Sequence, residues 1–329
     1  MSKDVIGLGL ESSCDETAAA VVKNGKEILS NIIFSQIDLH RDYNGVVPEI
    51  ASRSHLEVIN GIIEKALKDA GVTFSDLDYT SSANRPGLIG SLIISLQSAK
   101  AISYSLGIPL IAVSHLEAHL YAPYLDGFEM VYPCIGLLVS GGNTALFKIK
   151  GIGDYEFLGR TRDDAAGEAL DKAAKFMNLG YPGGPMIEKA ALKAVKKELI
   201  LPKLLADSED LDFSYSGLKT ALVNYCKKNP DFDINETAYS FQERALELLV
   251  RKSILAAEKN NIGRIAAAGG VTANKRLREI FKEKASGIDI IIPSPVLCTD
   301  NAAMTAGLAY HYYKSGKFTS LEADVSPRE

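Results

Sequence analysis

A strand, a polar turn and a second strand occur twice in this chain, and this pattern constrains the fold more than any other feature. Residues 5–10 form an apolar run, a polar turn follows at 12–17, and a second apolar run covers 18–22. The same order returns over residues 134–149. Apolar runs of this length, bounded by turn residues, are typical of buried strands. We interpret the two segments as copies of one strand-turn-strand unit, although two unrelated hairpins would give a similar pattern.

Helices and strands alternate along the rest of the chain, which is typical of the α/β class. Apolar spacing predicts helices over 48–70, 88–106, 165–177, 184–195, 215–226, 236–259 and 300–313, a further helix from 274, and strands from 28 and over 110–113, 265–268 and 288–292. The 329 residues suffice for two halves of one fold. We expect one half at 1–115 plus 297–329, and a second half with helical insertions at 116–296.

The composition is that of a globular protein, with 47% hydrophobic and 23% charged residues. No apolar run reaches the roughly 18 residues that span a membrane, and no signal peptide is visible. Four scattered cysteines fit reduced thiols better than a disulfide framework. We therefore expect a cytoplasmic protein without a membrane partner.

The net charge of −5 does not by itself suggest a nucleic-acid binder. An RNA partner would have to use local basic patches or other subunits. Lys193, Lys196 and Lys197 offer a small basic face, and a solvated helix surface is the other interpretation of the same residues.

His115 and His119 are four residues apart, so a helix would present both imidazoles on one face, one turn apart. A carboxylate brought in by folding would complete a three-ligand metal site with open positions for a substrate oxygen. The acidic segment around Asp300 lies most of a domain away along the chain. Two partly exposed surface imidazoles are the alternative. The zinc-protease pattern H-E-x-x-H is not met, because Leu116 stands where that pattern has glutamate.

Three glycine pairs lie in predicted turns, in Ser140-Gly141-Gly142, within 181–185 and within 268–274. Glycine lets a ligand approach the backbone, and backbone N–H groups in such turns can point at phosphate. Any one of them alone is more often a plain turn or a helix N-cap. Three together favour a nucleotide site lined by loops at strand ends, with Asn274 supplying an amide to a base or ribose.

Carboxylates gather at two further places. Glu11, Asp15 and Glu16 surround one turn, and like charges so close disfavour joint ionisation. That turn would bring Asp15 or Glu16 near a phosphate or the reacting nucleophile, or it is simply a polar turn. Asp171 lies too far into its predicted helix to cap it, so it would bind a ribose diol or face solvent.

Seven stretches in one order resemble the TsaD family, the tRNA N6-adenosine threonylcarbamoyltransferases. They are ESSCDET at 11–17, SHLEAH at 114–119, LVSGG at 138–142, DK at 171–172, YPGGP at 181–185, GGVTAN at 269–274 and CTDN at 298–301. The resemblance covers nearly the whole chain, and the Ser-Cys-Asp-Glu-Thr turn is similar to the bacterial and mitochondrial branch. It implies an α/β, actin-like ATPase fold, with two ribonuclease-H-like halves around a nucleotide cleft.

The resemblance also implies ligands for the site residues. A divalent metal, usually described as Fe2+ with Zn2+ or Mg2+ as alternatives, would be held by His115, His119 and Asp300. The adenylate substrate would be bound by Leu138, Val139, Ser140, Gly141, Gly142, Asp171, Gly184 and Asn274. Two departures from the family pattern bear on substrate affinity and rate. Asn143 stands where the family usually has histidine, and Arg85 stands where a glycine usually precedes Pro-Gly.

The implied reaction transfers the threonylcarbamoyl group of threonylcarbamoyl-AMP to N6 of adenosine 37 in tRNAs that read ANN codons. Asp15 is our candidate to orient or deprotonate the N6 amine. The implied partners are tRNA, the TsaB and TsaE proteins, and an upstream TsaC-type synthase.

Three other classes remain as alternatives. A small-molecule kinase of the same fold would explain the glycine turns but not the paired histidines. A nucleotide-switched scaffold would bind nucleotide without turnover. A metalloprotease is disfavoured by Leu116.

Overall fold

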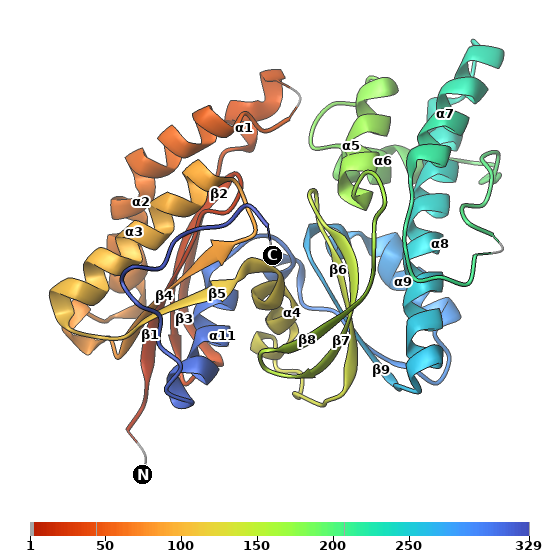
Figure 1. The fold of residues 1–329 in the computed structure, drawn as a ribbon. Helices are drawn as coiled ribbons and strands as arrows, with labels where there is room; N and C mark the ends of the chain where they lie inside the picture. Colours follow the sequence, from red (N-terminus) through yellow and green to blue (C-terminus); the bar gives the residue numbers. More distant parts are fainter. Residues whose placement is uncertain (1–2, 44, 207, 329) are drawn as a thin grey trace. The chain divides into compact units, whose positions relative to one another are not determined.

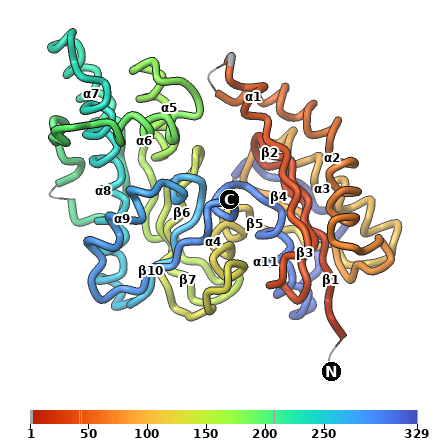
Figure 2. Tube along the Cα trace, turned by 180° about the vertical axis from the view of Figure 1, so that it is seen from behind, coloured from red at the N-terminus to blue at the C-terminus, as the bar shows by residue number. Residues whose placement is uncertain are grey.

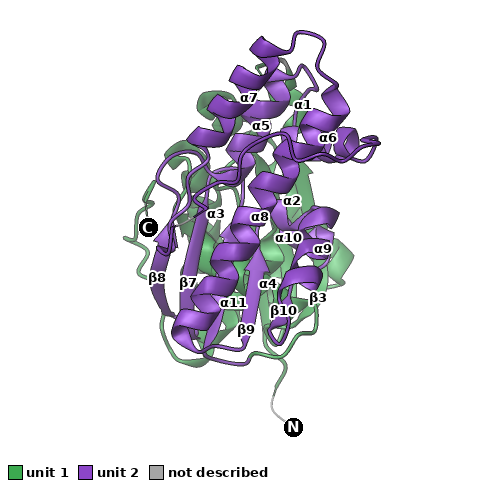
Figure 3. Ribbon diagram, turned by 90° about the vertical axis from the view of Figure 1, so that its right-hand side faces the viewer, with its two compact units in different colours: residues 1–130, 300–329 green, residues 131–299 purple. Residues whose placement is uncertain are grey.

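The protein has an α/β fold with two β-sheets, each of which contains five strands in a mixed parallel and antiparallel arrangement (Figure 1). The computed structural model describes residues 3–43, 45–206 and 208–328. The chain divides into two compact units, of which the first combines Met1–Met130 with Asp300–Glu329 and the second is Val131–Thr299 (Figure 3). Each unit contains one of the sheets.

The first unit has a sheet of order β3-β2-β1-β4-β5. Its elements are β1 (Ile6–Glu11), β2 (Glu16–Lys23), β3 (Glu27–Ser35), α1 (Ile37–His40), η1 (Arg41–Tyr43), α2 (Pro48–Ala70), η2 (Phe74–Asp76), β4 (Tyr79–Arg85), α3 (Ile89–Leu106), β5 (Leu110–Ser114), α4 (His115–Leu125) and α11 (Ala302–Lys314). Helices α2 and α3 run side by side against the sheet, and α11 packs on β1, β2 and β4 (Figures 1 and 2). The apolar face of α2, which includes Ile59 and Ile63, joins Leu8 and Leu10 of β1 in a buried core.

The second unit has a sheet of order β8-β7-β6-β9-β10. Its elements are β6 (Cys134–Val139), β7 (Thr144–Gly151), β8 (Asp154–Arg160), α5 (Ala166–Phe176), α6 (Gly183–Ala191), α7 (Ser216–Lys228), α8 (Ile234–Asn260), β9 (Arg264–Ala268), η3 (Gly270–Ala273), α9 (Lys275–Lys284), β10 (Asp289–Ile291) and α10 (Pro295–Cys298). Figure 2 shows β10 from behind. Helix α8 contributes much of the core, with Phe241, Leu246 and Leu249 fully buried.

The pairing pattern of the two sheets is the same, which confirms the internal repeat. Strand β1 pairs antiparallel with β2 and parallel with β4, and β6 pairs antiparallel with β7 and parallel with β9. Leu8 lies opposite Val21 and Thr80, while Leu137 lies opposite Leu146 and Ala267. The two strand-turn-strand segments of the sequence are therefore equivalent central hairpins.

Helix α4 lies in the first unit, whereas the predicted division at 115/116 assigned it to the second half. It packs against α11, and Tyr121 in α4 donates a hydrogen bond to the Gly25 carbonyl. Contact with α11 also places the chain after Asp300 in the first unit, three residues later than the predicted boundary at 297.

Two local predictions need correction. The helix predicted over 184–195 ends at Ala191, because the backbone N–H groups of residues 195, 196 and 197 all donate to the Glu236 carboxylate and Lys197 has a φ of 55°. Strand β4 was not predicted, since its Ser81 and Ser82 break the apolar pattern. Both hydroxyls are buried and hydrogen-bonded, to the Leu8 carbonyl and to Ser95. Among the described residues, no helix combines the length and the apolar character that a membrane span requires.

Candidate metal centre and glycine turns

The predicted metal ligands meet in the first unit. His115 begins α4 with Ser114 as its N-cap, His119 follows one turn later, and Asp300 directly precedes Asn301, the N-cap of α11. Asp300 Oδ1 lies 2.9 Å from His119 Nε2 and 3.7 Å from His115 Nε2. The three ligand atoms lie within 4.8 Å of one another. Two ligand atoms that bind one cation at about 2.1 Å in a tetrahedral or octahedral arrangement stand about 3–3.4 Å apart, so the distances of 2.9 and 3.7 Å from Asp300 to the two histidines suit a single metal ion.

The donor set also fits a divalent metal chemically. Two imidazoles and one carboxylate are the ligands that Fe2+ and Zn2+ accept, whereas Mg2+ and Ca2+ prefer oxygen alone. Burial acts to raise the pKa of the Asp300 carboxyl, but His115 and the hydrogen bond to His119 outweigh it and lower that pKa to about 2. The carboxylate is therefore ionised at neutral pH and able to bind a cation.

Glu11 at the end of β1 orients His115, a role that the sequence did not predict. Its Oε2 lies 3.3 Å from His115 Nδ1, and the Ser13 hydroxyl lies 3.2 Å from the same nitrogen. The fully buried carboxylate also accepts hydrogen bonds from the Ser13 N–H and the Thr305 hydroxyl. An imidazole whose Nδ1–H donates to a carboxylate keeps its Nε2 lone pair for a metal. By contrast, His119 Nδ1 is buried without a hydrogen-bond partner among the described atoms.

The turn between β1 and β2 carries Asp15, the predicted catalytic residue, which is 9% exposed. Burial, followed by the carboxylates of Asp300 and Asp15, raises the pKa of Glu16 well above its ordinary value. Burial and the same neighbouring carboxylates also raise the pKa of the Cys14 thiol. The crowding of negative charge expected from the sequence is thus found at this turn, and Asp300 adds to it.

The glycine turns of the second unit lie at one edge of its sheet. Strands β6 and β9 run parallel with Leu138 opposite Ala268, so the turns that follow them, at 140–142 and 269–270, emerge side by side. Gly269 has a φ of 94°, and a Cβ there would stand 2.4 Å from the Val139 carbonyl oxygen. Gly141 and Gly142 are exposed, and a Cβ on either would meet no described atom within 4 Å. Ligands in open α/β sheets bind beyond the carboxyl ends of strands such as these.

The other predicted substrate residues differ in how much of each residue is free to contact a ligand. The side chains of Leu138 and Val139 are fully buried, which leaves only their backbone for a ligand. The Ser140 hydroxyl accepts a hydrogen bond from the Asn143 N–H, so Asn143 closes the turn through its backbone. Gly184, in the first turn of α6, is half-buried.

Asp171 and Asn274 have structural partners. Asp171 accepts a hydrogen bond of 2.6 Å from the Gly183 N–H and so caps α6, the next helix, rather than its own. The side-chain oxygen of Asn274 accepts a hydrogen bond from the Leu277 N–H and so caps α9, and the side-chain nitrogen of Asn274 donates to the side-chain oxygen of Gln242. The N-cap interpretation of Asn274 is therefore realised, and a ligand would meet an amide that is already held in place.

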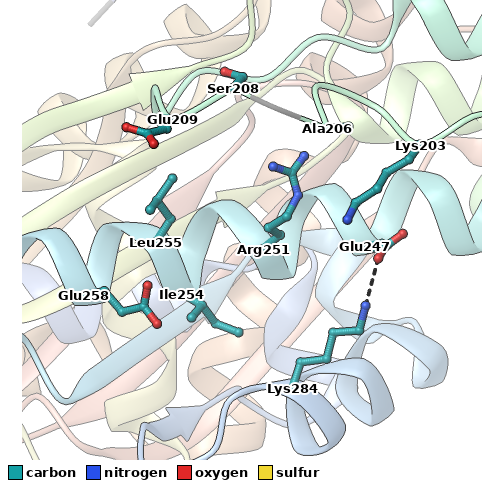
Figure 4. Close-up of a pocket in the computed structure, with 10 residues that line it drawn as sticks. All are labelled: Lys203, Ala206, Ser208, Glu209, Glu247, Arg251, Ile254, Leu255, Glu258 and Lys284. Atoms are coloured by element: carbon teal, nitrogen blue, oxygen red, sulfur yellow. Dashed lines mark hydrogen bonds and ion pairs between the residues drawn. The ribbon is translucent and has the colours of Figure 1, made fainter.

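A separate hollow of about 580 Å3 lies between α8, α9 and residues 203–206 and 208–209 (Figure 4). Among its charged groups, Lys284 contacts Glu247 at 2.9 Å, and Arg251 donates to the carbonyls of Leu204 and Leu205. The described residues that line it include none of the predicted substrate residues. We therefore do not assign the substrate to this hollow.

The known proteins that are similar in sequence, as reported below, are all named for the same enzymatic activity. The model of the TsaD family, described as tRNA N6-adenosine threonylcarbamoyltransferase, matches residues 27–307. A protein of that name from Syntrophomonas wolfei subsp. wolfei is 48% identical over 325 residues, which is 97% of this chain and 96% of the relative. Another from Clostridium kluyveri is 47% identical over 334 residues, covering 99% of this chain and 98% of the relative.

Solved structures with low sequence identity share the fold. HypF superposes with a TM-score of 0.64 at 14% identity, over 96% of this chain and 47% of HypF. Component A of (R)-2-hydroxyglutaryl-CoA dehydratase from Acidaminococcus fermentans gives 0.56 at 14% identity, over 95% of this chain and 100% of that protein. These neighbours confirm the actin-like ATPase fold. Because the family model covers most of the chain and the relatives are nearly half identical along almost their full length, the chain belongs to the TsaD family of tRNA N6-adenosine threonylcarbamoyltransferases.

Proposed function

We propose that this transferase moves the threonylcarbamoyl group of threonylcarbamoyl-AMP to N6 of adenosine 37 in tRNAs that read codons starting with adenine. The observation that carries the proposal is the meeting of His115, His119 and Asp300 in a member of this family. In the transfer, a bond forms between N6 and the carbamoyl carbon, the bond from that carbon to the phosphate oxygen breaks, and AMP leaves. The reaction belongs to t6A biosynthesis.

The exocyclic amine of adenine is a poor nucleophile, because its lone pair is delocalised into the ring. Positioning and charge stabilisation must therefore supply most of the rate. We assign donor binding to the second unit, where the exposed Gly141 and Gly142 backbone is open to a phosphate and Asp171 and Asn274 are rigidly held. Leu138, Val139, Ser140 and Gly184 complete this proposed adenylate site.

Asp15 is the proposed group that orients the N6 amine and accepts its proton. The neighbouring Glu16 has a raised pKa, so it holds its own proton more readily than an ordinary carboxyl group does. A metal held by His115, His119 and Asp300 would act as a Lewis acid on a substrate oxygen. The two-histidine, one-carboxylate set supports Fe2+ first, Zn2+ second and Mg2+ least.

The proposal extends to partners and location. Threonylcarbamoyl-AMP requires an upstream TsaC-type synthase, and the family implies TsaB and TsaE as companions of this chain. We place the reaction in the cytoplasm, where tRNA is modified. All four cysteines are free thiols, which agrees with a reducing compartment.

The test is mass spectrometry of tRNA nucleosides after incubation of the purified chain with tRNA, synthase, threonine, bicarbonate, ATP and the partner proteins. We expect the threonylcarbamoyl mark with the native chain and its loss with His115→Ala. The metal content of the same samples, measured by elemental mass spectrometry, should fall in His115→Ala and remain in Asp15→Asn. Full transfer by Asp15→Asn would contradict the role of Asp15, and full transfer by metal-free His115→Ala would contradict the role of the metal.

A further inference from the structure

The turn that carries Asp15 is fixed through three successive backbone carbonyls. The Ser13 carbonyl accepts a hydrogen bond of 2.9 Å from the Leu88 N–H, ahead of α3. The Cys14 carbonyl lies 3.0 Å from His55 Nε2 in α2. The Asp15 carbonyl accepts a hydrogen bond of 3.0 Å from the Gln36 N–H, at the start of α1. Three separate segments thus hold three consecutive peptide groups, and the turn cannot rotate without breaking several hydrogen bonds.

The two side chains behind this turn, His55 and Gln36, are fully buried and contact each other. The Gln36 amide nitrogen lies 3.2 Å from His55 Nδ1, and the Thr17 hydroxyl lies 2.7 Å from the same ring nitrogen. Both groups can donate, so Nδ1 accepts and the proton of a neutral ring is on Nε2. That tautomer is the one that donates to the Cys14 carbonyl.

His40 extends the same network with a consistent direction of donation. Its Nδ1 accepts a hydrogen bond from the Val47 N–H, so its Nε2 carries the proton and faces the Gln36 side-chain oxygen at 3.3 Å. The amide of Gln36 is therefore oriented with its oxygen toward His40 and its nitrogen toward His55. A buried network in which every member is satisfied is rigid and specifies one arrangement.

We propose that His55 and Gln36 are positioning residues, which hold the Asp15 turn in the conformation that catalysis requires. Neither side chain is assigned to substrate or metal: the His55 side chain acts through the Cys14 carbonyl, and the Gln36 side chain acts by orienting the His55 ring. This inference rests on the proposed function, because it assumes that Asp15 acts in the transfer. Misplacement of a reacting group by about 1 Å can cost on the order of a hundredfold in rate.

Cys14 provides a readout of the turn that does not depend on activity. It is half-buried, whereas Cys134, Cys226 and Cys298 are buried, and its carbonyl is the one that His55 holds. The rate at which a maleimide modifies Cys14 in the folded full-length chain, followed by peptide mass spectrometry, reports how often the turn opens. The three buried thiols report global unfolding in the same sample.

The experiment compares His55→Leu, which removes the shorter of two hydrogen bonds to the Cys14 carbonyl and leaves that of the Ser91 hydroxyl at 3.4 Å, with His55→Gln, whose amide can again donate to this carbonyl. For His55→Leu we expect Cys14 labelling at least about fivefold faster, unchanged labelling of the other three thiols, and kcat for tRNA modification lower by about tenfold or more. The KM for threonylcarbamoyl-AMP should stay within about twofold, because the donor site is assigned to the second unit. His55→Gln should restore most of both effects.

Two further variants secure the interpretation. Gln36→Met, of similar volume, should act as His55→Leu does if His55→Leu does not fold. His311→Leu is the matched control, since His311 is a partly buried histidine of the first unit whose partner is Tyr121. It should change neither Cys14 labelling nor kcat.

Unchanged Cys14 labelling in both His55→Leu and Gln36→Met would overturn the inference. Faster labelling with unchanged kcat would also overturn it, provided that Asp15→Asn is inactive. If Asp15→Asn itself keeps the full rate, the assignment of Asp15 in the proposed function fails, and the labelling result alone still decides whether His55 holds the turn.

Discussion

The turns after β1 and after β6 occupy equivalent positions in the two sheets, yet they are built for opposite purposes. The first, at 12–15, is mostly buried, and three of its carbonyls are bound by other segments. The second, at 140–143, is closed by Ser140 and Asn143, and one of its carbonyls, that of Ser140, accepts a hydrogen bond from the Gly167 N–H, while its glycines are exposed. One repeated backbone is therefore held at three carbonyls in the first unit and leaves exposed glycines in the second, where we propose that a ligand binds.

This difference shows how a duplicated hairpin can take two unlike roles. A turn that carries a reacting carboxylate and a metal-orienting carboxylate must be rigid, because both functions depend on side-chain direction. A turn that binds phosphate through its backbone needs an open approach and little side-chain volume. Four predictions test how far this contrast holds.

The largest effect is expected for Glu11→Gln, directly before the rigid turn. The substitution keeps the size of the side chain but weakens the hydrogen bond that orients His115, so metal affinity should fall by about 10–100-fold. Competition with a metal-binding dye measures this affinity. Glu117→Gln, in α4, is the matched control, because the Glu117 carboxylate accepts a hydrogen bond from the Tyr312 hydroxyl instead. Equal metal affinity of the native chain and Glu11→Gln would remove the orienting role of Glu11.

Gly87→Ala should displace the rigid turn, because the added methyl group would collide with Ser13. A Cβ at Gly87 would stand 2.7 Å from the Ser13 carbonyl oxygen and 3.0 Å from Ser13 Cβ, so backbone must shift. We expect a loss of about 1–3 kcal/mol in the free energy of unfolding, measured in urea. Gly61→Ala, in the middle of α2 with open space around it, should instead stabilise the fold by up to about 1 kcal/mol. Loss of stability in both variants would mean that crowding at Ser13 is not the cause.

Gly141→Ala should leave the fold intact and affect only the ligand. A Cβ there meets no described atom within 4 Å, so the free energy of unfolding should change by less than about 0.5 kcal/mol. The KM for threonylcarbamoyl-AMP should rise several-fold, because the methyl group blocks close approach to the backbone. Gly151→Ala, at the end of β7, has equally open surroundings and should leave this KM unchanged. An unaltered KM in Gly141→Ala would show that the open turn does not bind the donor.

The smallest effect is a pH dependence of stability that comes from His55 behind the rigid turn. Burial lowers the pKa of His55 below 6.5, outweighing the Cys14 carbonyl, Glu11 and Asp15, which raise it, while His40 lowers it further. As the pH falls, His55 is therefore protonated in the unfolded chain before it is protonated in the folded chain. This stabilisation is complete above about pH 6.5 and is lost as the pH falls toward the pKa of the folded state. Between pH 7 and pH 5.5, urea unfolding should show a smaller loss of stability for His55→Gln than for the native chain. Equal losses would indicate that His55 is not held neutral.

Much of the fold could be predicted, because the sequence pattern that indicates a helix or strand often lies within that helix or strand. The apolar run of β6 and the apolar face of α2 reveal their own periodicity, and Gly71 and Gly107 end their helices in the left-handed conformation. Strand β4 escaped prediction because its serines find their hydrogen-bond partners outside the strand, in β1, 73 positions away, and in α3, the next helix. The N-terminal cap that Asp171 supplies to α6 was missed for the same reason.

The sequence by itself determined the repeated hairpin, the histidine pair on one helix face and the glycine turns, because short-range spacing fixes which side chains share a face. Only the tertiary structure decided that Asp300 meets His119 across 181 positions, that Glu11 orients His115 across 104, and that His55 and Gln36 hold the Asp15 turn. Such contacts depend on how the sheet and its helices pack. Buried polar groups must find partners wherever packing brings them, and no local pattern records which partner that will be.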